Sequence, residues 1–239
     1  MQKFAPSLIV LLAVASVNAH ANLITNGSFE NTNNTFVGDV NKVDIPPLGS
    51  TAIPGWTTTT GAFLAWIENG NPYGISASDA QFFLDLTGYS DVGTYGGVRQ
   101  SFATAPGTNY VVTFDLGYGG NSGFFGGPVR VTASAGTSSG TFTSGSGTPN
   151  PAVWNHETFN FTATSSMTQL TITGLSTAGG DYIGLDNVDV EAAGTAGAVP
   201  EPGTAVLVLT GIGLSGWVAR RRTYNAARTP APLGLRIVG

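Results

Sequence analysis

The sequence predicts an all-β protein, an antiparallel β-sandwich of the jelly-roll kind, and three observations lead there. The 239-residue chain holds 34 glycines and 13 prolines, while charged residues make up only 10% of it; this composition suits short strands joined by turns. Apolar and polar residues alternate with a period of two along much of residues 22–191, as in half-buried strands. The same region has no sustained 3.6-residue period, so we expect no long amphipathic helix in it.

Strand-like runs follow one another through this region. In the clearest, the side chains that point to one side are Tyr110, Val112, Phe114 and Leu116. The other predicted strands are residues 22–25, 82–86, 97–103, 129–134, 158–163, 169–173 and 181–191. Residues 135–151, rich in Ser, Gly and Thr, predict a loop or a weak hairpin. About ten short strands joined by turns favour an antiparallel sandwich.

The last predicted strand contains an irregularity. Its apolar residues occupy odd positions up to Leu185 and even positions from Val188 onward, so the alternation shifts at Asp186 and Asn187. One extra residue there, a β-bulge, would keep both apolar sets on the core face. The bulge would also turn the Asp186 carboxylate sideways, as a ligand-bearing position requires.

The N-terminus has the features of a signal peptide. Lys3 supplies a positive charge, residues 8–17 are compactly apolar, and Ala19-His20-Ala21 has the small-x-small pattern of a cleavage site. The alternative is a buried N-terminal helix. The polar Asn22 and strand-like sequence follow at once, which favours a signal peptide over residues 1–21.

The C-terminal region has the features of a short transmembrane helix. Residues 204–219 carry no charge and would span about 24 Å as a helix, against a hydrocarbon core of about 30 Å. Such a helix could cross a thinned bilayer with Trp217 at the interface. The arginines at 220–222 would then be cytoplasmic. The alternative is a core helix, although an Arg triplet directly after an apolar stretch is hard to bury.

Three features in this order resemble the PEP-CTERM sorting domain of Gram-negative, exopolysaccharide-producing bacteria. They are a tetrapeptide, the apolar helix and an arginine cluster, and the matching positions of the tetrapeptide and the cluster are Val199, Pro200, Glu201, Pro202, Arg220, Arg221 and Arg222. The resemblance implies an exosortase that processes the chain near Glu201. It further implies export through the inner membrane, transient anchoring, and a final place in the envelope or outside the cell. Residues 223–239 depart from the usual pattern and predict a disordered tail, and residues 192–198 predict a linker.

The charge of the chain argues against nucleic-acid partners, and its lack of cysteine excludes disulfide bonds. Residues 22–198 contain 13 acidic side chains and three basic ones, a net charge of 3 − 13 = −10. Such a domain repels phosphate backbones, so we expect no nucleic-acid partner. The chain has no cysteine, so an exported domain must be stabilised by core packing, with a bound cation as a further candidate.

Both ends of the predicted sandwich resemble galactose-binding-domain-like jelly rolls, a group that includes carbohydrate-binding modules and the DUF642 proteins. The matching segments are residues 22–30, NLITNGSFE, and 184–188, GLDNV. The middle resembles the choice-of-anchor C proteins, whose activity is not established, at residues 54–56, 83–88, 96–102 and 110–116. Together these segments cover most of residues 22–191, so the resemblance implies one ectodomain of this fold.

The same resemblance implies a structural calcium that joins the first and last strands. Its ligands here would be the carbonyls of Asn26 and Gly27 and the carboxylates of Glu30 and Asp186. The alternative assigns these residues ordinary structural roles: Gly27 makes a turn, Phe29 packs in the core and Glu30 faces water. Both interpretations stay open at this point.

Motifs for catalysis are nearly absent, and we expect no enzyme. After signal removal His156 is the one remaining histidine, and a solvated strand-edge histidine is a simpler interpretation than a triad member. A pair of carboxylates for glycoside hydrolysis could come from Asp85, Asp91, Asp115 and Glu157. Their spacing does not distinguish catalysis from surface and turn positions.

Carbohydrate binding is the sharper functional hypothesis. Sugar rings stack on exposed aromatic side chains while polar groups bind the hydroxyls. Candidate rings in or beside Gly-, Asn- and Ser-rich loops are Trp66, Tyr73, Tyr89, Tyr95 and Tyr118. Their alternative is partial burial under those loops. Trp56 and Trp154 lie at the edges of strand patterns, and we expect them in the core.

Two functions therefore remain from sequence. The first is a structural or adhesive component of the extracellular matrix, associated with exopolysaccharide. The second is a carbohydrate-binding module that recognises an extracellular polysaccharide. The absence of an aromatic row on one predicted strand face favours the first.

Overall fold

The computed structural model describes residues 22–59, 64–88, 95–121, 125–177 and 182–194. The chain divides into two compact units, residues 1–193 and 194–239, and the fold below belongs to the first. The predicted signal peptide, the helix at 204–219 and the tail lie outside the described residues. Within those residues, no helix is long and apolar enough to cross a membrane.

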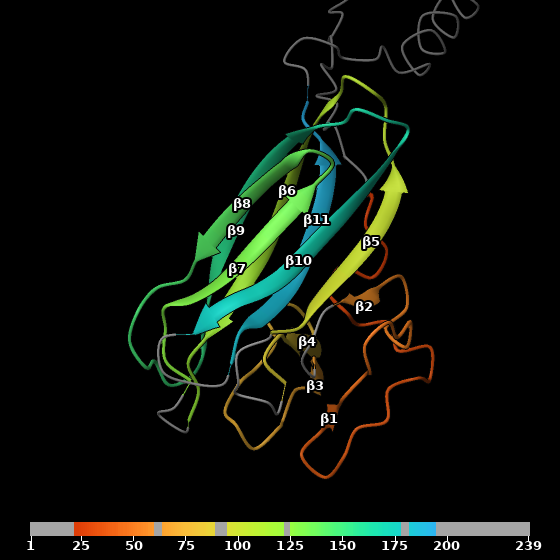
Figure 1. Cartoon of the computed structure of the whole chain (residues 1–239). Coiled ribbons are helices and arrows are strands. Elements are labelled where there is room, and N and C mark those ends of the chain that lie inside the picture. The colour runs from red at the N-terminus through yellow and green to blue at the C-terminus, as the bar shows by residue number, and fades with distance from the viewer. Residues whose placement is uncertain (1–21, 60–63, 89–94, 122–124, 178–181, 195–239) are drawn as a thin grey trace, which may run out of the picture. The chain divides into compact units, whose positions relative to one another are not determined.

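Eleven strands within the described residues form two antiparallel sheets that face each other (Figure 1). One sheet has six strands in the order β1-β3-β4-β11-β6-β9, and the other has five in the order β2-β5-β10-β7-β8. The bounds of the strands are β1 Val43–Asp44, β2 Thr57–Thr59, β3 Ala65–Glu68, β4 Phe82–Asp85, β5 Gly97–Ala103, β6 Asn109–Tyr118, β7 Val129–Ala135, β8 Ser138–Thr143, β9 Val153–Thr162, β10 Met167–Thr177 and β11 Gly184–Ala192. The predicted antiparallel sandwich is confirmed.

Two local predictions meet different outcomes. The Ser-rich stretch after β7 forms the hairpin strand β8, which pairs with β7 along its full length. The strand predicted at residues 22–25 is wrong. Leu23 donates one backbone bond to Val190, but the chain turns from Thr25 onward, where Asn26 has a φ of 56°. A left-handed residue at that point ends any ladder with β11.

The β-bulge predicted in the last strand is confirmed. The register of β11 against β6 shifts between Asp186 and Asp189, and Asn187 adopts a φ of 50°. Leu185 and Val188 are both buried as a result. The extra residue therefore keeps the apolar side chains on either side of it in the core.

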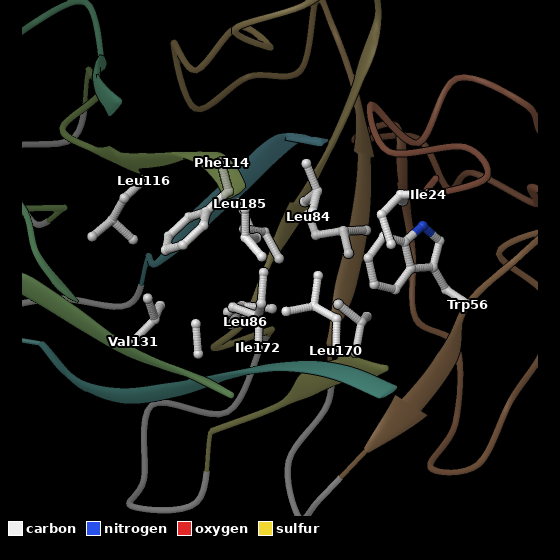
Figure 2. Close-up of a cluster of buried hydrophobic side chains, with 14 of the residues drawn as sticks. Ile24, Trp56, Leu84, Leu86, Phe114, Leu116, Val131, Leu170, Ile172 and Leu185 are labelled. Carbon is white, nitrogen blue, oxygen red and sulfur yellow. The ribbon is translucent and has the colours of Figure 1, made fainter. Parts of the chain in front are cut away.

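The core fills the space between the two sheets (Figure 2). Its labelled members are Ile24, Trp56, Leu84, Leu86, Phe114, Leu116, Val131, Leu170, Ile172 and Leu185. Burying one such side chain contributes about 1.5–3 kcal/mol, and in a chain without cysteine this packing replaces disulfide bonds. The prediction that Trp56 belongs to the core is confirmed, since its residue is 2% exposed.

A second apolar cluster lies on the outer face of the six-stranded sheet. Its buried members are Val43, Ala65, Ile67, Ile75, Phe83 and Tyr182. The β3–β4 segment (residues 69–81) covers this part of the face, because Ile75 packs into the cluster and Ser76 accepts a hydrogen bond from the Trp154 indole. The rest of the outer face, on β11, β6 and β9, is polar.

Candidate functional site: a polar chain across three strands

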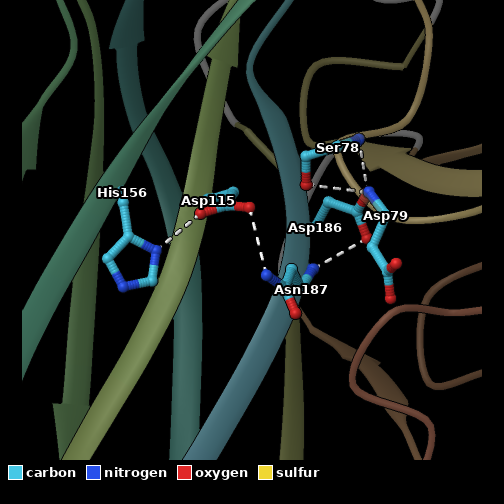
Figure 3. Close-up of polar contacts among 6 residues, drawn as sticks. All are labelled: Ser78, Asp79, Asp115, His156, Asp186 and Asn187. Carbon is cyan, nitrogen blue, oxygen red and sulfur yellow. Dashed lines mark hydrogen bonds and ion pairs between the residues drawn. The ribbon is translucent and has the colours of Figure 1, made fainter.

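Three polar side chains are hydrogen-bonded in a row across β9, β6 and β11 (Figure 3). His156 Nδ1 lies 2.8 Å from Asp115 Oδ1, and Asn187 Nδ2 donates to Asp115 Oδ2 at 3.3 Å. Because a carboxylate only accepts, the proton of this pair lies on Nδ1, and Nε2 is left for other partners. Asp115 therefore holds two neighbouring polar groups in fixed orientations.

Strand register brings these three residues together. Asp115 lies directly opposite His156 in the β6–β9 ladder and opposite Asp186 in the β6–β11 ladder. The bulge sets Asn187 one position further, from which its amide reaches Asp115. The His156 side chain is 60% exposed and that of Asp115 13%, so this polar chain (Asn187, Asp115, His156) is open to solvent at its histidine end.

Trp154 lies beside the polar chain. It precedes His156 by two residues on β9, and therefore shares its face of the sheet. Its indole is half-buried, donates from Nε1 to the Ser76 carbonyl at 3.0 Å, and packs edge-on against Phe83 with ring centroids 5.9 Å apart. Gly117 lies opposite Trp154; a Cβ there would come within 2.7 Å of the indole, so only glycine lets the ring lie flat against the sheet.

The hydroxyl of Tyr182 lies in the same place. A Cβ on Gly117 would also meet this hydroxyl at 2.7 Å, and Tyr182 is 1% exposed. The hydroxyl has no hydrogen-bond partner among the described residues. Burial, followed by the nearby Asp85 and Asp186 carboxylates, raises the pKa of Tyr182 well above its usual value, so the hydroxyl stays protonated.

Asp186 forms a second polar centre beneath the β3–β4 segment (Figure 3). Its Oδ2 accepts hydrogen bonds from Ser78 N at 2.8 Å, Ser78 Oγ at 3.1 Å and Asp79 N at 3.0 Å, and its Oδ1 accepts from Asn187 N at 2.7 Å. The residue is 0% exposed. Burial raises the pKa of Asp186 to about 7, against the opposing effect of these hydrogen bonds.

The other predicted calcium ligands are engaged in the same way. The Asn26 carbonyl accepts from Trp56 Nε1 at 2.8 Å, and the Gly27 carbonyl from Val188 N at 3.0 Å. Glu30 Oε1 accepts from the backbone N–H groups of residues 81 and 82, at 2.8 and 2.6 Å. Among the described residues no three His, Cys, Asp or Glu side chains gather as a metal site.

Each of these four residues already accepts a hydrogen bond from the protein, so a calcium ion would share or compete for oxygens that have partners. The structural alternative is confirmed for Gly27 and Phe29 but is wrong for Glu30, which is bonded to backbone N–H groups instead of facing water. Gly27 lies in a turn, and a Cβ on it would collide with the Val188 carbonyl oxygen. Phe29 is 0% exposed in the core, and Glu30, half-buried, caps the start of β4. Calcium stays a prediction, to be tested by chelation.

The predicted aromatic rings do not form one platform. Trp66 is the clearest correction: it lies in β3, is 0% exposed and packs against Phe36 and Phe82 in the core. Tyr118 ends β6 and is 8% exposed. Burial under neighbouring segments therefore describes both rings.

Of the three other predicted rings, two are half-buried and one lies outside the described residues. Tyr73 and Tyr95 are half-buried, and Tyr73 packs edge-on against Phe125. Tyr89 lies outside the described residues. The expectation of a core position for Trp154 holds in part, because its ring joins the outer cluster while remaining half-exposed.

The signal for Trp154 was present in the alternation of β9. Phe159 and Phe161 are the buried residues of that strand. The even-numbered positions therefore face the other way, and Trp154 and His156 are among them. Strand parity would have placed this ring on the polar face.

The other carboxylates considered for catalysis, where the structure describes them, have roles of their own in the sheet. Asp85 accepts from Thr87 N at 2.9 Å and from Ile183 N at 3.0 Å, so it stabilises the end of β4. Glu157 pairs opposite Phe114 and so lies on the other face of the sheet from Asp115. Asp91 and the sorting-motif residues 199–222 lie outside the described residues.

Comparison with known proteins identifies two parts of the chain. Residues 22–184 match the model of DUF642, described as a protein of unknown function. Residues 198–222 match the PEP-CTERM protein-sorting motif. No curated protein matches the chain at a significant level.

Several solved structures have a similar chain path. TmCBM61 in complex with β-1,4-galactotriose is 13% identical with a TM-score of 0.42, covering 72% of this chain and 99% of its own. A family 35 carbohydrate-binding module from Clostridium thermocellum is 14% identical with a TM-score of 0.34, covering 63% and 92%. An adhesin domain of Lys-gingipain from Porphyromonas gingivalis is 16% identical with a TM-score of 0.44, covering 70% and 96%. Similarities at this level carry no inference about a ligand of this chain.

Proposed function

The chain belongs to the DUF642 family, and from that premise and its PEP-CTERM sorting motif we propose an exported protein with a structural or adhesive role in the extracellular matrix. In this proposal an exosortase sorts the chain in a Gram-negative bacterium and processes it near Glu201. The sandwich is then displayed at, or released from, the envelope, where it associates with exopolysaccharide. The sorting motif is the observation that carries the proposal.

Two properties of the sandwich support a role outside the cell. Its core residues include many with no exposure, such as Phe29, Phe114 and Leu116, so core packing stabilises a module that has no cysteine for disulfides. Its net charge is strongly negative, which keeps a displayed domain soluble and disfavours contact with nucleic acid.

A second candidate function is that of a carbohydrate-binding module that recognises one polysaccharide. The observation that favours it is the polar chain, in which Asp115 fixes His156 and Asn187 beside the half-exposed Trp154 ring. Sugar sites combine an aromatic face with a few oriented polar groups. This arrangement lies on an open sheet face.

Processing is tested by mass spectrometry of the protein recovered from the native envelope and medium. We expect a mature chain that begins at Asn22 and ends close to Pro200. Substitution of the motif, Glu201→Ala, should leave a longer chain in the membrane fraction. Thr223→Ala, outside the motif, is the matched control and should be processed normally. Identical mature masses for wild type and Glu201→Ala would contradict exosortase sorting.

The two candidate functions are separated by a glycan array with the mature exported protein. A matrix component without a specific ligand should bind no defined polysaccharide tightly and should still localise to the matrix. Micromolar binding to one polysaccharide, lost in Asp115→Asn, would establish the carbohydrate-binding module instead.

A further inference from the structure

We propose that the open outer face around the polar chain binds an amine-bearing polysaccharide, a chain of hexosamines with free amino groups. This inference rests on the proposed association with polysaccharide and names its chemical class and its site. The site consists of Trp154, His156, Asp115 and Asn187. Neutral and uronic-acid polysaccharides are the competing classes.

Strand register places the site on three neighbouring strands. The register of β6 against β9 and the bulge in β11 bring one residue from each of three strands into a hydrogen-bonded row. Adjacent strands lie about 4.8 Å apart, so the row spans about 10 Å. That length suits an extended sugar chain lying across the strands, since one polar side chain comes from each of the three strands.

The charged side chains around the site are mostly acidic. The outward-facing acidic residues of this region are Asp115 on β6 and Asp189 and Glu191 on β11, and burial raises the pKa of Asp189. The cations of the described residues lie elsewhere: Arg99 and Arg130 are on the five-stranded sheet. At physiological ionic strength charges are screened beyond about 8 Å.

Lys42, the third cation, pairs with Glu68 at 3.6 Å in the β1–β3 region. The one basic group on the face itself, His156, is bound to Asp115. A uronic-acid chain would therefore meet like charge, whereas a protonated amine would meet carboxylates. Charge complementarity selects the amine-bearing class.

The chemistry of the site's side chains suits the same class of ligand. The half-exposed Trp154 ring offers an aromatic face to the apolar side of a pyranose and attracts an ammonium group. Asp115 accepts hydrogen bonds from an ammonium, and the amide of Asn187 and Nε2 of His156 suit hydroxyls.

An independent observation points to the same place. The Tyr182 hydroxyl is buried at Gly117, the outward-facing position next to Asp115 on β6, and has no partner among the described residues. A buried hydroxyl without a partner costs about 1–3 kcal/mol. The described residues therefore leave one polar group unsatisfied at the same position where Trp154 packs.

The test is affinity electrophoresis and calorimetry of the mature exported protein with three oligosaccharide series: glucosamine, N-acetylglucosamine and polygalacturonate. We expect binding to the glucosamine series only, weakening as salt is raised. Asp115→Asn should weaken it at least tenfold. Asn187→Gly, which keeps the backbone able to adopt a positive φ, should weaken it by less.

Glu68→Gln is the charge-matched control. It removes one negative charge from a half-exposed ion pair. Such pairs contribute little to stability, so the fold should be retained. Glucosamine binding should be unchanged, because Glu68 is not part of the site. Circular dichroism of each variant verifies that the fold is retained. Equal losses in Asp115→Asn and Glu68→Gln would overturn the site.

The outcomes distinguish this inference from the proposed function. Binding to polygalacturonate, or equal binding to the acetylated and free-amine series, overturns the amine-bearing class and leaves association with polysaccharide standing. Failure to bind any polysaccharide, together with a matrix that forms normally without the protein, overturns both.

Discussion

The carboxylate of Asp186 connects the last strand to the β3–β4 segment. It accepts hydrogen bonds from two backbone N–H groups and one hydroxyl of that segment, contributed by Ser78 and Asp79. The segment in turn covers the outer apolar cluster through Ile75. One buried side chain therefore determines how much of the outer face is covered and where the open part begins.

Stability should fall as the pH rises from about 4 to about 7. Burial raises the pKa of Asp186 from 3.8 to about 7, so the folded protein keeps a proton that the unfolded chain loses over this range. The contribution is fully present below about pH 4 and is lost as the pH approaches 7. One pKa unit corresponds to about 1.4 kcal/mol, which sets the upper limit of the slope per pH unit.

Chemical denaturation at several pH values checks this prediction. Asp186→Asn does not titrate, so we expect a lower stability and a flatter pH profile. Glu68→Gln is the control and should retain the wild-type slope. Parallel profiles for wild type and Asp186→Asn would mean that another group causes the dependence.

Gly27 lies where the first segment of the chain packs against β11, and this close contact depends on the absence of a side chain there. A Cβ at this position would collide with the Val188 carbonyl oxygen, which itself lies on the bulged strand. Gly27→Ala should therefore cost about 2 kcal/mol or more, as is usual for overpacking a buried contact. Thermal denaturation measures the loss.

Gly107→Ala provides the comparison for that experiment. Nothing lies within 4 Å of a Cβ there, but the φ of Gly107 is +83°, so the substitution costs backbone strain of about 1–2 kcal/mol and no collision. A Gly27→Ala variant that melts above Gly107→Ala would contradict the close approach to Val188.

At the scale of elements, the bulge in β11 determines which residues reach which face. Deletion of Asn187 should unfold the domain, because a shift of one residue would turn Val188 and Val190 out of the core. Asn187→Gly is the matched control: it keeps the residue count and the positive φ and should remain folded. Circular dichroism and proteolysis distinguish the two. A folded deletion variant would show that the register is not specified by the bulge.

In strand β9, side-chain alternation explains the position of Trp154. Its buried positions, Phe159 and Phe161, were recognised from their alternation with polar residues. The same alternation extends back to Trp154, which the sequence interpretation assigned to the core because it lies at a strand edge. The structure shows that strand parity continues through this edge, so the ring lies on the outer face of the sheet and packs against the outer apolar cluster.

For the whole molecule, we expect thermal stability to be the same with added calcium and with EDTA. The oxygens of Asn26, Gly27, Glu30 and Asp186 accept hydrogen bonds from the protein, so each already has a partner that does not depend on a cation. Calorimetric melts of the mature protein provide the measurement. A melting temperature that rises with calcium and falls with EDTA would support the ion that the family resemblance implies.

The architecture was largely predictable because its signals are local. Alternation along residues 110–116 and the parity change at Asp186 appear within single strands, and both describe which face meets the core. The sequence did not predict the shortest strands, because a local signal needs several residues. β1 and β2 hold two and three residues, too few for an alternation to be recognised. The ring of Trp66 was misassigned because its four-residue strand has loop-like neighbours.

The sequence by itself determined the sandwich, the bulge, the acidic charge and the PEP-CTERM motif, since each depends on composition or on residues close together in the chain. Only the tertiary structure decided which polar residues meet. His156, Asp115 and Asn187 come from three strands, with 41 and 72 positions between the bonded pairs. Their contact depends on strand order and register, which side-chain alternation within one strand does not encode.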